Sequence, residues 1–112
     1  MTNKEWLNRG WKLMDEIASL EMAADTAVKR RGKKAAAEYL QKIKEKEREL
    51  MKVHLQILQA IYTLEDRKDR QILQLRYLAY LSHEEIADIM GYEETRSVAR
   101  RIESAAERIV CR

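Results

Sequence analysis

The side chains best suited to act on another molecule lie near the C-terminal end of the chain. Arginines recur there at helical spacing beside an apolar row, at positions 96, 100, 101 and 108. A guanidinium group pairs at two points with guanine or holds a phosphate, so arginines on one helix favour contact with DNA. The alternative interpretation is a solvated basic helix face. The expected DNA-contacting residues of this segment are Thr95, Arg96, Ser97, Arg100 and Arg101.

A short capped helix and a glycine turn precede these arginines. Ser82 followed by Glu85 predicts a capping box at the start of a helix over residues 83–90. Gly91 permits the positive φ that the chain needs to leave that helix. A second helix is predicted over residues 96–110. Its apolar row is spaced by four, three and four residues: Val98, Ile102, Ala105 and Ile109. The combination indicates a helix-turn-helix, whose second helix enters the major groove.

Charge in this part of the chain is unevenly distributed. Residues 82–94 carry five acids and no lysine or arginine, whereas residues 95–112 carry five arginines and two glutamates. Positive charge is therefore concentrated on the last predicted helix, where it favours phosphate contact over a short range. His83 lies on the first turn of the preceding helix, where it either touches a phosphate or faces solvent.

Long helices are predicted in the N-terminal half, over residues 3–29 and 33–64, and a shorter one over residues 67–80. Gly10 lies inside the first, where it costs about 1 kcal/mol relative to alanine. The second carries apolar residues at heptad spacing, with Glu47 and His54 interrupting the complementary row, which is typical of a coiled-coil seam. These seam residues are Ala36, Ile43, Leu50, Ile57 and Leu64, complemented by Leu40, Glu47, His54 and Ile61.

Because a long helix is not stable alone, the first helix must fold back on the second, or a second chain must cover it. We expect an all-α protein made of an antiparallel helical hairpin arm, residues 1–65, and a helix-turn-helix domain, residues 66–112. The absence of proline, the three glycines and the abundance of Ala, Leu, Glu, Lys and Arg support this fold class.

The segment KRRGKK carries five positive charges around a glycine and is predicted to form the tip of the hairpin. Two interpretations remain open. The charges either hold a DNA or RNA backbone without sequence preference or are simply hydrated. The residues concerned are Lys29, Arg30, Arg31, Lys33 and Lys34.

Several function classes find no support in the sequence. There is no glycine-rich phosphate loop, no nucleophile elbow and no metal-binding spacing, so neither an enzyme, a cofactor nor a metal is expected. No apolar run approaches the roughly twenty residues of a membrane span. The single cysteine, Cys111, has no intrachain partner, which is compatible with a reducing cytoplasm.

From Asp66 onward, the chain resembles region four of bacterial sigma factors. The positions that carry the resemblance are Arg70, Ile72-Leu73, Leu75-Arg76-Tyr77, Leu81-Ser82, Glu85-Ile86-Ala87, Gly91, Val98 and Ala105. With its charged hairpin, the whole chain resembles small phage proteins of this type and phage late-operon transcriptional activators from Gram-positive hosts. The resemblance implies duplex DNA binding through the last helix and a role in switching phage genes. It also implies a partly buried ion pair between Arg76 and Glu85.

The sequence departs from the family in three respects. Nothing resembles sigma region two, so a complete sigma factor is excluded. Val98 lies seven residues after Gly91, one more than is usual in the family. Glu93 and Glu94 occupy the start of the expected recognition helix, where carboxylates are unfavourable beside phosphates.

The sequence predicts a sequence-specific DNA-binding transcriptional regulator that is phage-encoded and acts in the host cytoplasm. Its expected partners are double-stranded DNA, a second copy of the chain and RNA polymerase. One alternative is a structural DNA-handling subunit, such as a small phage packaging component. Another is a protein-interaction module that binds RNA polymerase or a host defence protein, an alternative that the acidic stretch over residues 84–94 supports.

Overall fold

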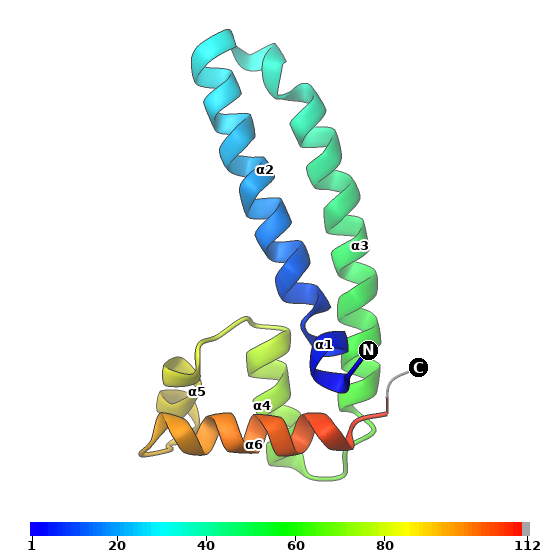
Figure 1. Ribbon diagram of the computed structural model, residues 1–112, viewed down its shortest axis with the longest axis vertical. Coiled ribbons are helices and arrows are strands. Elements are labelled where there is room, and N and C mark those ends of the chain that lie inside the picture. Colours follow the sequence, from blue (N-terminus) through cyan, green and yellow to red (C-terminus); the bar gives the residue numbers. More distant parts are fainter. Residues whose placement is uncertain (111–112) are drawn as a thin grey trace.

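A computed structural model, which describes residues 1–110, shows an all-α protein with no strand in that range (Figure 1). This confirms the predicted fold class. The elements in chain order are α1 (Asn3–Leu7), α2 (Arg9–Arg31), the 3-10 helix η1 (Lys33–Ala36), α3 (Ala37–Ile61), α4 (Arg67–Tyr77), α5 (His83–Met90) and α6 (Thr95–Arg108). Cys111, for which no partner was expected, lies outside the described residues.

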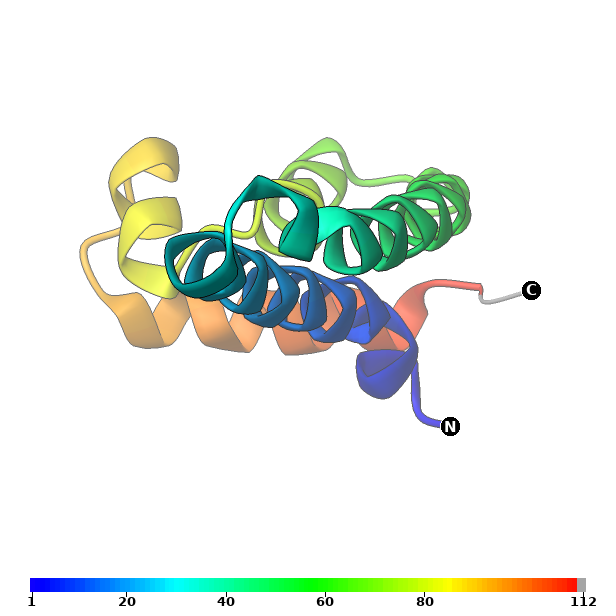
Figure 2. The ribbon, with the colours of Figure 1, turned by 90° about the horizontal axis from the view of Figure 1, so that it is seen from above.

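The molecule is elongated, with extents of 51 × 32 × 20 Å. Helices α2 and α3 form an antiparallel hairpin, and α6 runs across its base at a large angle (Figures 1 and 2). The turn between α2 and η1 is therefore at one end of the molecule and α6 is at the other. In residues 1–110, no helix combines the length and apolarity that crossing a membrane requires.

Local side-chain caps set where α4 and α5 begin, and the cap of α5 was expected. Ser82 accepts a hydrogen bond from the Glu85 amide at 3.1 Å, and the Glu85 carboxylate accepts one from the Ser82 amide at 3.0 Å. Asp66 caps α4 by accepting from the amides of Lys68 and Asp69. Gly91 ends α5 at φ 76°, in the left-handed region that glycine favours. Each cap contributes about 1 kcal/mol, so these boundaries follow from local sequence.

The first predicted helix is two helices, because the chain bends at Asn8, where ψ is −4°. The bend allows α1 to pack on α6 while α2 packs on α3. Leu7 is completely buried in the common core, and the Asn3 side-chain amide donates to the Ala106 and Ile109 carbonyl oxygens at 3.0 and 3.2 Å. The first helix therefore supports the C-terminal end of α6 as well as beginning the hairpin.

The predicted seam of α3 is correct for one row, whereas the other row is wrong in its first half and buried only at its end, where Ile61 is 0% exposed. The row that runs from Ala36 to Leu64 is buried or half-buried, but Leu40 is 52% exposed and Glu47 is also exposed. Val53 and other residues outside the predicted rows are buried instead. The reason is that the lower half of α3 packs against α4 as well as α2, so its buried face is wider than a two-helix seam.

One continuous core joins the hairpin to the C-terminal helices. Its fully buried side chains come from five helices, so burial fixes the direction of α6 relative to the hairpin. Burying each contributes roughly 1.5–3 kcal/mol. The largest of them are Leu7, Ile57, Ile61, Ile72, Leu73, Ile86 and Val98.

Helix α4 ends at Tyr77 and not at residue 80 as predicted, because Tyr80 adopts φ 58°. The left-handed region costs a non-glycine residue roughly 1–2 kcal/mol. Contacts with the hairpin offset this cost. The Tyr80 ring lies edge-on to Trp11, 5.0 Å between centroids, and its hydroxyl is hydrogen-bonded to Nε2 of His54. Gly10 leaves room for that hydroxyl, since a Cβ there would lie 2.5 Å from it. Tyr80 thus connects the helix-turn-helix to both arms of the hairpin.

Candidate nucleic-acid interface

The first two turns of α6 present free polar and basic groups. Thr95 begins the helix, one residue earlier than predicted, and is exposed. Arg96 and Arg100 are also exposed, and neither takes part in an ion pair within residues 1–110. Ser97 is half-buried beside them. The structure therefore brings four of the five expected α6 residues together as a free polar surface.

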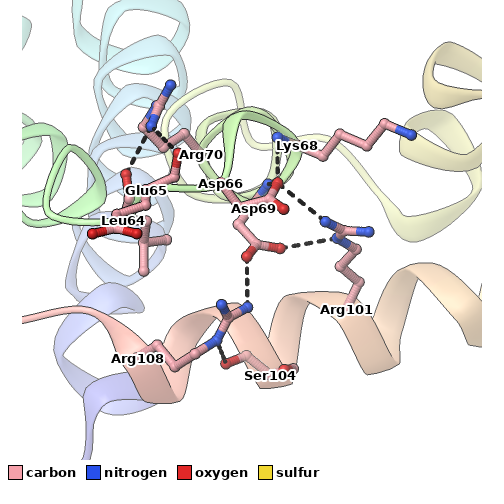
Figure 3. Close-up of polar contacts among 9 residues, drawn as sticks. All are labelled: Leu64, Glu65, Asp66, Lys68, Asp69, Arg70, Arg101, Ser104 and Arg108. Atoms are coloured by element: carbon pink, nitrogen blue, oxygen red, sulfur yellow. Dashed lines mark hydrogen bonds and ion pairs between the residues drawn. The ribbon is translucent and has the colours of Figure 1, made fainter.

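Arg101, the fifth expected contact residue, has a different environment. Its Nε donates to Oδ1 of Asp69 at 2.9 Å, and its Nη2 lies 3.2 Å from Oδ1 of Asp66 (Figure 3). Arg108 Nη2 contacts the other Asp69 oxygen at 2.6 Å. Asp69 is only 2% exposed, and a buried carboxylate needs such partners. Arg101 therefore helps hold α6 against α4.

Asp66 connects this network to the cap of α4. Its pKa is lowered, chiefly by the hydrogen bond from the Asp69 amide, with smaller contributions from the Lys68 amide and from the charges of Arg101 and Arg108. Arg101 retains one nitrogen, Nη1, for which no partner is found in the part of the chain that the structure describes. A shallow hollow of about 480 Å³ lies between the start of α4 and α6. It is lined by Asp66, Asp69, Ser97, Arg100, Arg101, Ser104 and Arg108.

His83 lies on the opposite flank of α6, in a second hollow of about 550 Å³. Lys4 of α1 and Arg76 of α4 line the same hollow, together with Glu103 of α6. Burial lowers the pKa of His83, and the positive charges of Arg76 and Lys4 lower it further. Three basic side chains from three helices therefore converge beside α6. Sequence reasoning missed Lys4 because only the docking of α1 brings it here.

The expected ion pair between Arg76 and Glu85 does not form. Arg76 donates to the Leu81 carbonyl oxygen at 2.9 Å, and its guanidinium lies 4.8 Å from the centre of the Trp11 ring. Glu85 is occupied by the capping box with Ser82. The prediction is therefore wrong: α2 supplies an aromatic face to Arg76, and the helix start satisfies Glu85.

Acidic side chains mark the limits of the basic surface. Glu93 and Glu94 are exposed just before α6, and Glu94 makes no capping bond to the helix with its side chain. Glu103 and Glu107 are exposed on the later turns. A polyanion would therefore be held by the first two turns of α6 and repelled from the later ones.

The basic tip residues stand apart from α6. All five are exposed where α2 meets η1, at the far end of the hairpin (Figure 1).

Among the described residues, no cluster of three or more histidine, cysteine, aspartate or glutamate side chains has the arrangement to hold a metal ion.

Comparison with known proteins agrees with this geometry. Residues 60–108 match the family model of sigma-70, region 4, a span that begins at the end of α3 and covers α4, α5 and α6. Over these residues the chain is similar to sigma-70 region 4, which is a DNA-binding helix-turn-helix type of domain. Neither curated proteins nor solved structures gave a match.

Proposed function

We propose that this protein is a sequence-specific regulator of transcription, encoded by a phage, that binds double-stranded DNA with α6 in the major groove. The observation that carries the proposal is the free polar surface on the first two turns of α6. Its arginines, Arg96 and Arg100, have no carboxylate partner in the described chain, while the paired arginines of the same helix hold it in place.

The roles of the groove-facing residues follow from their chemistry. Arg96 and Arg100 lie one turn apart and donate to guanine edges or to phosphates. Thr95 and Ser97 donate to phosphate oxygens near the start of the helix, where the helix dipole also favours an anion. Arg101 contributes only through its remaining nitrogen, because Asp66 and Asp69 occupy the other two.

The hollow around His83 supplies contacts on the other flank of α6. A duplex seated on the first turns of this helix has a phosphate strand on each side of the groove. Arg76 and His83, at the side of that hollow away from Glu107, are suited to contact one of those strands, and Lys4 joins them where a phosphate replaces Glu103, its partner at 3.8 Å. We propose these contacts for affinity and register, since phosphates carry no direct sequence information.

We further propose that the protein acts as a homodimer and contacts RNA polymerase through the hairpin, in the cytoplasm of the host. A single helix-turn-helix contacts few base pairs, and a second half-site multiplies specificity. The surface that suits a protein partner is the exposed apolar row of α3. It contains Met51 (67% exposed) and Leu55 (60%), and Tyr62 (62%) follows directly after the end of the helix.

The decisive experiment is selection of bound duplexes from random DNA by the full chain, followed by affinity measurements on the selected site. Arg96→Ala and Arg100→Ala are each expected to weaken binding by about 1–3 kcal/mol, with relaxed preference at one base pair wherever the arginine pairs with guanine. The matched control is Arg48→Ala, which removes an exposed arginine from the side of the hairpin. Affinity unchanged by both α6 substitutions, or no enriched sequence, would contradict the proposal.

Oligomeric state needs a separate measurement. Light scattering on the wild type is expected to give a dimer, and Leu55→Lys to give a monomer if the α3 row forms the interface. A ring-sized assembly would favour the packaging alternative. Tight capture of a protein partner without any duplex binding at low salt would favour the interaction module.

A further inference from the structure

The tip of the hairpin is a second basic surface, separated from α6 by most of the 51 Å length of the molecule (Figure 1). It carries five cations within six residues, and no acid interrupts them. All five side chains are exposed: Lys29, Arg30, Arg31, Lys33 and Lys34.

The helix dipole stabilises only some of the cations in this cluster. Cations in the last turn of α2 are favoured by the helix dipole, and Lys29 also pairs with Asp25 at 3.1 Å. Lys33 and Lys34 stand at the start of the next helical segment, where the dipole opposes positive charge. Within the described range, none of the other four cations forms an ion pair. The folded chain therefore leaves this repulsion largely uncompensated.

The backbone keeps the charges close together. Gly32, at φ 92°, is the only residue between α2 and η1, so the turn cannot spread the cations apart. Small buried residues beneath the tip, among them Ala27 and Ala36, let the two helices approach closely. A hollow of about 340 Å³ beside the tip is lined in part by Arg30, Arg31 and Tyr39. The result is a compact positive end on a rigid helical arm.

We propose that the tip binds the phosphates of a second DNA duplex, so that the protein joins two DNA segments. The inference rests on the proposed function for the first duplex, which α6 holds. A polyphosphodiester chain is the ligand that relieves repulsion among closely spaced cations, and it does so without sequence preference. Because the tip is far from α6, it is placed to hold a separate segment and not to widen the α6 footprint.

The test is capture of one duplex by another. A bead-bound duplex of roughly 20 base pairs, about two helical turns, is loaded with the full chain and then offered a fluorescent duplex of the same length. The tip variant changes all five cations to glutamine. We expect it to capture the second duplex about tenfold less than wild type, because its phosphate contacts at the tip are lost. Each lost contact should also reduce the slope of log affinity against log salt concentration by about 0.9.

The matched control removes the same charge from the sides of the hairpin. It changes five exposed basic residues to glutamine: Lys12, Lys42, Lys44, Arg48 and Lys52. Both variants shift the formal net charge from +3 to −2, since 3 − 5 = −2. The control is expected to capture the second duplex as wild type does, and thermal melting checks that both variants are folded.

The outcomes separate the two proposals. If the tip variant captures the second duplex as well as wild type, for instance because a dimer bridges through two α6 helices, the inference is overturned and the proposed function stands. The same holds if wild type binds one duplex in an Arg100-dependent way but never two. If binding depends on the tip alone and ignores Arg96 and Arg100, both the bridging and the proposed function fail.

Discussion

The carboxylate of Asp69 is shared by Arg101 and Arg108, with N···O distances of 2.9 and 2.6 Å. Asp69 lies in the first turn of α4, and both arginines come from α6. This relationship divides the arginines of α6 into two groups. One group holds the helix on the core, and the other is left free toward solvent.

Removing the shared carboxylate should destabilise the protein. Asp69→Ala leaves Arg108 without its carboxylate partner and Arg101 with only Asp66, so we expect a loss of about 2 kcal/mol in the free energy of unfolding. Urea denaturation followed by circular dichroism measures it. Asp25→Ala, which removes an exposed carboxylate with one lysine partner, is the control and should cost less than about 1 kcal/mol. Equal effects of the two substitutions would refute the structural role of Asp69.

Gly10 should not tolerate a side chain while Tyr80 keeps its hydroxyl. Helix propensity alone predicts that Gly10→Ala stabilises by about 1 kcal/mol. We expect the reverse, a loss of about 1–3 kcal/mol, because the new Cβ would lie 2.5 Å from the Tyr80 oxygen and the ring is held by Trp11 and His54. In a double-mutant cycle, Tyr80→Phe should relieve much of the penalty. Additive effects would show that the two residues do not meet.

Stability should increase with pH across the histidine range. Burial lowers the pKa of His54 below 6.5, and the pKa of His83 is lowered by burial and by two nearby cations. The unfolded chain therefore binds more protons than the folded one just below pH 6.5, so stability is lost as pH falls from there toward the folded-state pKa values. Melting temperatures between about pH 5 and pH 8 measure this effect.

Variants of the two histidines assign the pH effect. His54→Gln and His83→Gln should each flatten part of the dependence, and the double variant should remove most of it. A slope that survives the double substitution would mean that other groups are responsible. Because Asp66 also has a lowered pKa, a separate loss of stability is expected only at more acidic pH, below its unfolded value of about 3.8.

The N-terminal turn should stabilise the end of α6. Asn3→Ala removes hydrogen bonds to carbonyl oxygens of the last turn of α6, which we expect to cost about 1 kcal/mol. Amide hydrogen exchange should show faster exchange in the last turn of α6 and in α1, with little change in α5. Ser19→Ala, at an exposed position of α2, is the control. Unchanged exchange in α6 would show that α1 does not support it.

Local sequence patterns were enough to predict several helix boundaries and the candidate surface of this protein. The box at Ser82, the cap at Asp66 and the exit at Gly91 each depend on residues within four positions of one another. Their energies are local, so the sequence alone predicted where α4 and α5 begin. The start of α6, which has no side-chain cap, was predicted to within one residue from its apolar spacing. The candidate surface on Thr95, Arg96, Ser97 and Arg100 was predictable because the apolar spacing of α6 indicates which of its side chains are left for solvent.

Contacts between residues distant in sequence decided the rest. Whether an arginine of α6 is free depends on Asp69, 32 positions before Arg101. Helical spacing places Arg101 nearer the apolar row than Arg100, but it does not supply the carboxylate that Arg101 meets. The same applies to Lys4 beside His83, and to Gly10 beneath Tyr80. Spacing along a helix gives the direction of a side chain, but the partner it meets depends on how separate helices pack.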